Sequence, residues 1–371
     1  MTTSVNDLLS RAWVRIKSPI DGWLFLLASL LFILSMVVLF SASNQSMDRI
    51  ANKMTFMVIS MGVMWGIANL RPQHLMVLAL PAYIAGMLLL IAVALFGEVV
   101  NGSRRWLHIG ITRIQPSEVM KLALPMMLAW YFQRHEGRIR WKQYLVAMLL
   151  IMLPGALILK QPDLGTATMI MSSGLFVVFL AGLPWKVIFS SLVLFGASLP
   201  FVWNMLHDYQ RRRVLTLIDP MEDPLGAGYH IIQSMIAIGS GGPFGKGWLN
   251  GTQTHLDFIP ERTTDFIFAV YAEEFGLVGN IFLVLLYTAV IGRGLMIAAK
   301  ATTLFGRLMA GSITLTFFTY AFVNMGMVSG ILPVVGVPLP LVSYGGTAMV
   351  SLLVGFGILM SIHKNRPLIK R

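Results

Sequence analysis

The chain has 371 residues, of which 56% are hydrophobic and only 12% are charged, and its mean hydropathy is +0.75. Soluble domains carry about twice that density of charge, so the composition excludes an ordinary soluble domain and favours a protein embedded in a bilayer. The sequence contains no cysteine, which excludes disulfides and thiolate metal sites. The net charge of +12 is scattered over short segments between apolar stretches, which favours a role in membrane topology over nucleic-acid binding.

Ten stretches meet or approach the roughly 17 to 25 apolar residues that a helix needs to cross a bilayer. They are residues 23–40, 55–70, 75–96, 118–132, 144–159, 167–183, 185–205, 266–298, 305–328 and 343–362. Because backbone polar groups must pair internally in lipid, the sequence predicts an all-α polytopic membrane protein with about ten transmembrane helices. We expect one membrane domain over residues 1–371.

The distribution of Lys and Arg predicts the orientation of these helices. An even number of crossings places both termini on one side, and cytoplasmic loops carry an excess of positive residues. With the termini inside, about sixteen cations lie in inner segments and about six in outer loops. The tails 1–22 and 363–371 are therefore expected in the cytoplasm.

One connection, residues 206–265, is far longer than the others. Loops beyond about 15 residues are usually functional or disordered, and this one contains Trp248 and the apolar run 231–238, which is unlike a solvated linker. We expect it to fold against the outer face of the membrane, between the seventh and eighth helices.

Charged residues at the edges of the predicted helices are the candidates for chemistry, because they are costly there unless they face a polar cavity. Glu118 and Lys121 follow the Gln115-Pro116 turn and lie three residues apart on one helical face, so they can pair as ions. A purely structural ion pair explains them equally well. Asp163 follows a second Gln-Pro turn, and a helix cap explains it equally well.

Two further groups of residues belong to the long connection. Asp265 ends it, where an acid favoured by the helix dipole is the plainer interpretation. The run 207–213 includes Gln210 and Arg213 and places three arginines beside hydrogen-bonding groups, which suits an anionic phosphate. A solvated basic turn is the competing interpretation. Glu273 and Glu274 lie about 12 Å deeper along the helix, where a buried acid needs a polar interior or a paired cation.

Three long segments carry a family resemblance. They are DPMEDPLGAGYHIIQSMIAIGSGG (219–242), FIPERTTDFIFAVYAEEFG (258–276) and LVSYGG (341–346). With these segments the chain resembles the SEDS family of shape, elongation, division and sporulation proteins. The sequences GYHIIQS and PERTTDFIFAV resemble its elongation-type members more than its division-type members. The resemblance covers nearly the whole chain.

The resemblance implies a multi-pass protein of the bacterial inner membrane with ten helices and a large extracytoplasmic loop between the seventh and eighth. It also implies glycosyltransferase activity on lipid II and a class B penicillin-binding protein as partner. By the family motifs the essential acid is Asp265, and the remaining candidate positions are Trp106, Arg113, Glu118, Lys121, Asp163, Gln210 and Arg213.

The chemistry that this predicts is the attack of a sugar 4-hydroxyl on an anomeric carbon while a lipid diphosphate leaves, with inversion. Asp265 would act as the base, and Arg213, Arg113 and Lys121 or a divalent cation such as Mg²⁺ or Mn²⁺ would neutralise the leaving group. Two alternatives stay open: a transporter that flips the precursor, for which membrane-embedded acids such as Glu274 would also serve, and a noncatalytic scaffold that would not need Asp265.

Overall fold

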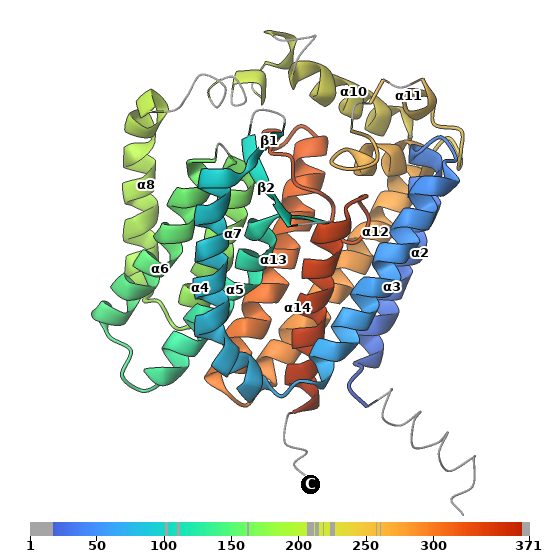
Figure 1. The fold of residues 1–371 in the computed structure, drawn as a ribbon. Helices are drawn as coiled ribbons and strands as arrows, with labels where there is room; N and C mark the ends of the chain where they lie inside the picture. Colours follow the sequence, from blue (N-terminus) through green and yellow to red (C-terminus); the bar gives the residue numbers. More distant parts are fainter. Residues whose placement is uncertain are drawn as a thin grey trace, which may run out of the picture.

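The computed structural model describes residues 18–100, 103–109, 112–161, 163–205, 211, 215–217, 219–222, 227–256, 258–259 and 261–365. These residues form a bundle of roughly parallel and antiparallel helices, capped at one end by shorter elements (Figure 1). The long helices are α2 (Gly22–Ala42), α3 (Met47–Asn69), α4 (Pro72–Phe96), α5 (Pro116–Arg134), α6 (Trp141–Leu159), α7 (Leu164–Leu180), α8 (Trp185–Met205), α12 (Ile267–Ala299), α13 (Leu304–Val328) and α14 (Gly346–Lys364).

Each of the ten apolar stretches coincides with one of these helices to within three residues at the ends of the stretch. Among the described residues, seven helices are long and apolar enough to cross a membrane, and α7 and the segment Trp185–Phe201 of α8 are shorter apolar helices. Helix α5 is continuous, but its apolar sequence is interrupted by Glu118, Lys121 and Arg134. The predicted all-α polytopic membrane architecture is thus confirmed, while the number of ten crossings and the domain boundaries stay predictions.

A small antiparallel sheet in the connection after α4 was not predicted. Its strands β1 (Glu98–Val100), β2 (Ser103–Ile109) and β3 (Thr112–Ile114) pair in the order β1-β2-β3, with Glu98 opposite Trp106 and Leu107 opposite Ile114. Strands of three residues show no clear alternation in sequence, although tryptophan, isoleucine and threonine favour the extended backbone. The sheet lies between the bundle helices at the capped end (Figure 1).

The start of α2 and the end of α14 lie at the same end of the bundle (Figure 1). Asp21 caps the start of α2 and its carboxylate lies 3.2 Å from the ring of His363, in the last turn of α14. Arg293, near the end of α12, also pairs with Asp21. This geometry agrees with an even number of passes through the bundle.

The described parts of the long connection pack on the opposite end. They include the 3₁₀ turn Pro220–Glu222, helix α10 (Ala227–Ser240) and the short helix α11 (Thr252–His255), and α10 runs across the end of the bundle (Figure 1). The Ser234 hydroxyl donates to the Val328 carbonyl (2.9 Å), and the Trp248 indole donates to the Val37 carbonyl (3.0 Å). The described parts of the connection therefore pack on the helices, and their location at the outer face of the membrane stays a prediction.

A close backbone approach anchors this connection on α12. Gly276 has a φ of 64° inside the helix, and a β-carbon there would stand 2.2 Å from the backbone nitrogen of Gly245. Glu273 next to it is fully buried, pairs with Lys246 (2.8 Å) and accepts from the backbone of Gln253 (3.0 Å). Of the two environments expected for a buried acid here, Glu273 thus has the paired cation, and the pair docks the loop on α12.

Candidate active site

A polar cavity of about 370 Å³ lies between β2, α5, α7, α13 and the segment before α14. Three of the predicted site residues, Trp106, Glu118 and Lys121, line it. The other lining side chains that carry polar or aromatic groups are Phe56, Arg105, Gln115, Thr166, Tyr320 and Thr347. Phe56 belongs to α3, so residues from six separate parts of the sequence meet around one space.

Glu118 and Lys121 form an ion pair on the wall of this cavity. The distance from Lys121 Nζ to Glu118 Oε1 is 2.6 Å, and only 13% and 11% of their side chains are exposed. The Ser351 hydroxyl donates to the second carboxylate oxygen of Glu118 (2.6 Å), and the Lys121 amine lies 4.9 Å from the centroid of the Tyr320 ring. The predicted pairing is present, and each member has a further partner that fixes its direction.

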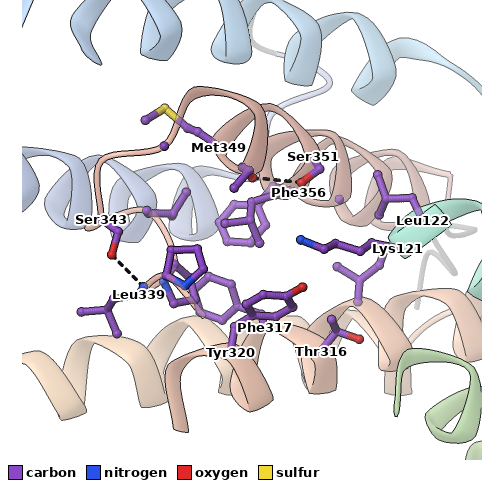
Figure 2. A pocket seen from close by; sticks show the side chains of 18 of the residues that line it. Lys121, Leu122, Thr316, Phe317, Tyr320, Leu339, Ser343, Met349, Ser351 and Phe356 are labelled. Atoms are coloured by element: carbon purple, nitrogen blue, oxygen red, sulfur yellow. Dashed lines mark hydrogen bonds between the residues drawn. The ribbon is translucent and has the colours of Figure 1, made fainter. Parts of the chain in front are cut away.

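A second, smaller cavity of about 50 Å³ continues behind the pair, between α5, α13 and α14. Figure 2 shows Lys121 extending its amine into this space above Tyr320, with Thr316 and Ser351 nearby. Lys121 and Tyr320 line both cavities. Lys121 is thus a cation shared by the polar cavity and a narrow pocket deeper in the bundle.

Asp163 caps α7, as the plainer interpretation predicted. Its carboxylate accepts from the backbone nitrogen of Thr166 (3.1 Å) and from the Thr166 hydroxyl (2.8 Å). The same carboxylate lies 3.1 Å from Nε of Arg105, which lines the cavity. Asp163 is buried and does not line the cavity itself, so in the described residues its contribution is to hold Arg105 at the rim.

Asp265 lies in the turn that precedes α12, and its support comes from distant parts of the chain. The Asn324 amide donates both to the Asp265 carbonyl (2.8 Å) and to the Val337 carbonyl (2.7 Å). The side chain is half-buried. Burial, reinforced by the negative charge of Glu261 and opposed by Arg105, raises the pKa of Asp265 to about 6.

Asp265 does not itself line the 370 Å³ cavity, but it borders a residue that does. A β-carbon on Gly336, which lines the cavity, would stand 3.3 Å from Oδ2 of Asp265. The carboxylate therefore lies directly behind a position that has no side chain. Gly336 is the point at which Asp265 and the cavity approach each other.

Three predicted positions cannot be placed in the cavity. Gln210 and Arg213 lie outside the described residues. Arg113 is described by its backbone alone, which pairs with His108 across β2 and β3. Their predicted role in binding stays a prediction.

Several residues of the site were not selected from the sequence. Arg105 adjoins the selected Trp106, but the strand that directs it was not predicted. Tyr320 and Asn324 are polar groups inside an apolar stretch, and such groups are functional candidates in a membrane helix, so a signal for them existed. Nothing in the sequence around Gly336 indicates that it lies beside the carboxylate of Asp265, which is 71 positions away in the chain.

An apolar groove of about 380 Å³ adjoins the cavity, between α4, α5 and α14. Its lining includes Ala82, Val119 and Met126, and it shares Gln115 and Glu118 with the polar cavity. An open space with an almost entirely apolar wall thus meets a polar space with two cations. The arrangement suits an amphiphile whose head group and tail bind side by side.

Comparison with known proteins gives the family. The sequence pattern of the FtsW/RodA/SpoVE family, described as cell cycle proteins, matches residues 22–367. The chain is 51% identical over 356 residues to the peptidoglycan glycosyltransferase MrdB of Escherichia coli strain K12, with 96% of both chains covered. This chain belongs to the FtsW/RodA/SpoVE family.

Other members of the FtsW/RodA/SpoVE family match over similar lengths. The chain is 34% identical to the probable peptidoglycan glycosyltransferase FtsW of Aliivibrio salmonicida, covering 94% of this chain and 91% of the relative. Its structure superimposes with a TM-score of 0.83 and 34% identity on a chain of a peptidoglycan synthase complex that coordinates polymerization and crosslinking, covering 94% and 98% of the two chains. It matches the rod shape determining protein RodA of Thermus thermophilus with a TM-score of 0.71 and 29% identity, covering 93% and 97%.

These matches confirm the predicted membership, with the resemblance to RodA-type enzymes, and the predicted class of enzyme, a glycosyltransferase of peptidoglycan synthesis. The chain is an integral membrane protein of the FtsW/RodA/SpoVE family.

Proposed function

We propose that the chain polymerises lipid II, the lipid-linked disaccharide precursor of peptidoglycan, into glycan strands, with Asp265 as the general base. The observation that carries this proposal is the junction of a polar, cation-lined cavity with an apolar groove at Gln115 and Glu118. An isoprenoid tail suits the groove, and a sugar diphosphate suits the cavity. The carboxylate behind Gly336 then lies within reach of a sugar that fills the cavity.

In this proposal the 4-hydroxyl of the acceptor sugar attacks the anomeric carbon of the donor. The hydroxyl proton passes to the Asp265 carboxylate, the new glycosidic bond forms, and the bond from the anomeric carbon to the diphosphate oxygen breaks with its electrons on the leaving group. A single displacement of this kind inverts the anomeric centre. The raised pKa of Asp265 makes its carboxylate a stronger base than an exposed aspartate.

The diphosphate needs positive charge as it leaves. Arg105 and Lys121 supply it from the walls of the cavity, while Trp106 offers an aromatic face to a sugar. Arg105 is added to the cations of the sequence-based hypothesis. Arg213 and Arg113, whose side chains lie outside the described residues, keep their proposed role. Lys121 keeps its proposed role.

A requirement for Mg²⁺ or Mn²⁺ is also part of the proposal, with the substrate as the main ligand. No group of three or more His, Cys, Asp or Glu side chains gathers in the part of the chain that the structure describes. Magnesium is commonly held by substrate phosphates with few protein ligands, so oxygens of the diphosphate would hold the cation. It would neutralise the leaving group alongside the two side chains.

The proposed setting is the bacterial inner membrane with both termini in the cytoplasm and the cavity at the outer face. The positive residues of the short loops and the pairing of Asp21 with His363 support a common side for the termini. We further propose a class B penicillin-binding protein as partner. The structural match to a peptidoglycan synthase complex of polymerization and crosslinking supports it.

The test is polymerisation of purified lipid II by the full chain with its partner in detergent, followed as the length of the glycan product. A positioned base contributes about 10²- to 10⁴-fold, so Asp265→Asn should lose that factor while its unfolding temperature stays near that of the wild type. Unchanged polymerisation by this variant would refute the base assignment. Movement of precursor across liposomes without any polymer would instead identify a flippase.

A further inference from the structure

Lys53 is a buried lysine in a helix that mostly faces outward. Only four residues of α3 are buried, Lys53, Ser60, Met64 and Ala68, and the side chain of Lys53 is 1% exposed. Its amine donates to the Ser35 hydroxyl and to the carbonyls of Val342 (2.5 Å) and Ser343 (3.1 Å). Within the described residues no carboxylate forms an ion pair with it. A cation at such a place is costly, and packing alone does not require one.

The segment that Lys53 holds, residues 337–344, also holds the turn that carries Asp265. The Ser343 hydroxyl donates to the Thr264 carbonyl (2.6 Å), and the Tyr344 backbone nitrogen donates to the Thr263 carbonyl (2.8 Å). The same hydroxyl accepts from the backbone nitrogen of Leu339 (2.8 Å), as Figure 2 shows. The Ser343 hydroxyl is therefore held by two hydrogen bonds, and one of them fixes the carbonyl of Thr264, the residue before Asp265.

Helix α3 touches this turn at a second point. The Arg49 guanidinium donates to the Thr263 hydroxyl (3.5 Å), and Arg49 and Lys53 are four residues apart, on the same face of the helix. Lys53 does not line the 370 Å³ cavity, so it has no contact with the space assigned to substrate. The hydrogen bonds of its amine link it to the Asp265 turn through Val342 and Ser343.

We propose that Lys53 is a positioning residue for the polymerisation reaction, because it fixes the segment whose Ser343 and Tyr344 hold the backbone on either side of Thr264, next to Asp265. The inference rests on the proposed role of Asp265. Loss of the amine loosens the carboxylate relative to Gly336 and the cavity. Of this segment, Val337 and Pro338 line the cavity. The Asn324 amide holds the Val337 carbonyl independently of Lys53, so substrate binding should change little.

The experiment measures kcat and KM for lipid II with full-length Lys53→Met, Ser343→Ala and the double variant. Misplacement of a reacting group by about 1 Å can cost about 10²-fold, so each single variant should lose about 10- to 100-fold in kcat with KM within about twofold of the wild type. Because both act on one path, the double variant should lose no more than the worse single variant. Lys53→Arg, which keeps donors at this point, should retain more activity than Lys53→Met.

Ser361→Ala is the matched control. The Ser361 hydroxyl donates to the Leu70 carbonyl (2.6 Å) and so ties α14 to the far end of α3, away from residues 337–344. This variant also removes a hydrogen bond between α3 and a distant part of the chain, but its kcat should stay within about twofold of the wild type. An equal loss in kcat for Ser361→Ala would reduce Lys53 to a general structural role and overturn the proposal.

Other outcomes separate the two proposals. Unchanged kcat in folded Lys53→Met, or a raised KM with unchanged kcat, overturns the positioning role. If Lys53→Met does not fold, Ser343→Ala decides alone, because it removes only one hydroxyl. Full turnover by Asp265→Asn would overturn the base assignment itself, whereas loss in Asp265→Asn with normal turnover in Ser343→Ala would overturn only the inference about Lys53.

Discussion

Oδ2 of Asp265 lies 3.3 Å from the point where a β-carbon on Gly336 would stand. Gly336 lines the polar cavity, so the carboxylate lies beside a residue of the cavity wall, and a side chain at this position would press on it. Its φ of 77° is also a backbone conformation that other residues rarely adopt. Both facts make Gly336 as informative a target as the acid itself.

The first prediction concerns Gly336→Ala. The new methyl group should push the Asp265 carboxylate by a few tenths of an ångström, and kcat should fall about tenfold. Gly137 provides a matched control, because its φ is also 77° but a β-carbon there meets nothing within 4 Å. Both variants should lose about 1 kcal/mol of stability from backbone strain, whereas only Gly336→Ala should lose turnover. Equal turnover in the two variants would contradict the assigned approach of Asp265.

The second prediction concerns the pH profile of kcat/KM. A base must be deprotonated, and the pKa of Asp265 is raised to about 6 by burial and by Glu261, with Arg105 opposing. Activity should therefore fall about tenfold per pH unit below about pH 6. Because Glu261 raises this pKa, Glu261→Gln should move the acid limb to lower pH, while Arg105→Ala should move it to higher pH. A limb near pH 4 that neither variant moves would assign the profile to another group.

The helices could be predicted from sequence because the length of an apolar stretch fixes whether a helix can cross lipid. The limit of that signal is visible at α3. The helix begins at Met47, eight residues before the apolar stretch 55–70, because its first two turns are polar. Lys53 was therefore counted with the outer loops, whereas the structure places it inside the helix and buries it.

The site could be predicted only in part. Trp106, Glu118 and Lys121, three of the positions taken from the family resemblance, line one cavity, and their roles stay predictions. The contacts that complete the site join residues far apart in the chain, such as Asn324 with Asp265 and Ser351 with Glu118. A single sequence contains no measure of such distances, so Gly336, Asn324 and Arg105 required the structure.

The third prediction separates structure from catalysis in the Glu118 and Lys121 pair. Either single change, Glu118→Gln or Lys121→Met, leaves one charge without its partner in a largely buried place and should lower both the unfolding temperature and kcat. In the exchanged variant E118K/K121E, the pair can re-form, so the unfolding temperature should recover. Its kcat should stay about 10²-fold below that of the wild type, because the cation no longer faces the diphosphate. Recovery of kcat as well would make the pair purely structural.

The fourth prediction concerns stability at the end of the bundle where the termini meet. The Asp21 carboxylate is 2% exposed and pairs with Arg293 and His363. Burial alone would raise the pKa of Asp21. The hydrogen bonds from Arg293 and the Leu24 backbone, with the positive charges of Arg293 and His363, hold this pKa below its usual value of 3.8. Removal of one partner of a buried pair costs about 3 to 5 kcal/mol, so Asp21→Asn should lower the unfolding temperature in detergent while kcat per folded molecule is retained.

The exposed pair of Arg307 with Glu136 is the control for this loss. The two charged atoms are 3.9 Å apart, and both side chains are about half exposed. Because exposed pairs contribute about 0 to 1 kcal/mol, Glu136→Gln should leave the unfolding temperature nearly unchanged.

The sign of the pH dependence of the Asp21 contribution to stability is also fixed. Because the folded pKa of Asp21 is lowered, its contribution is present above about pH 4 and is lost as the pH falls through the folded pKa. Wild type and Asp21→Asn should therefore converge in unfolding temperature as the pH is lowered, and a difference that persists at the lowest pH would assign the loss to packing rather than to the ion pair.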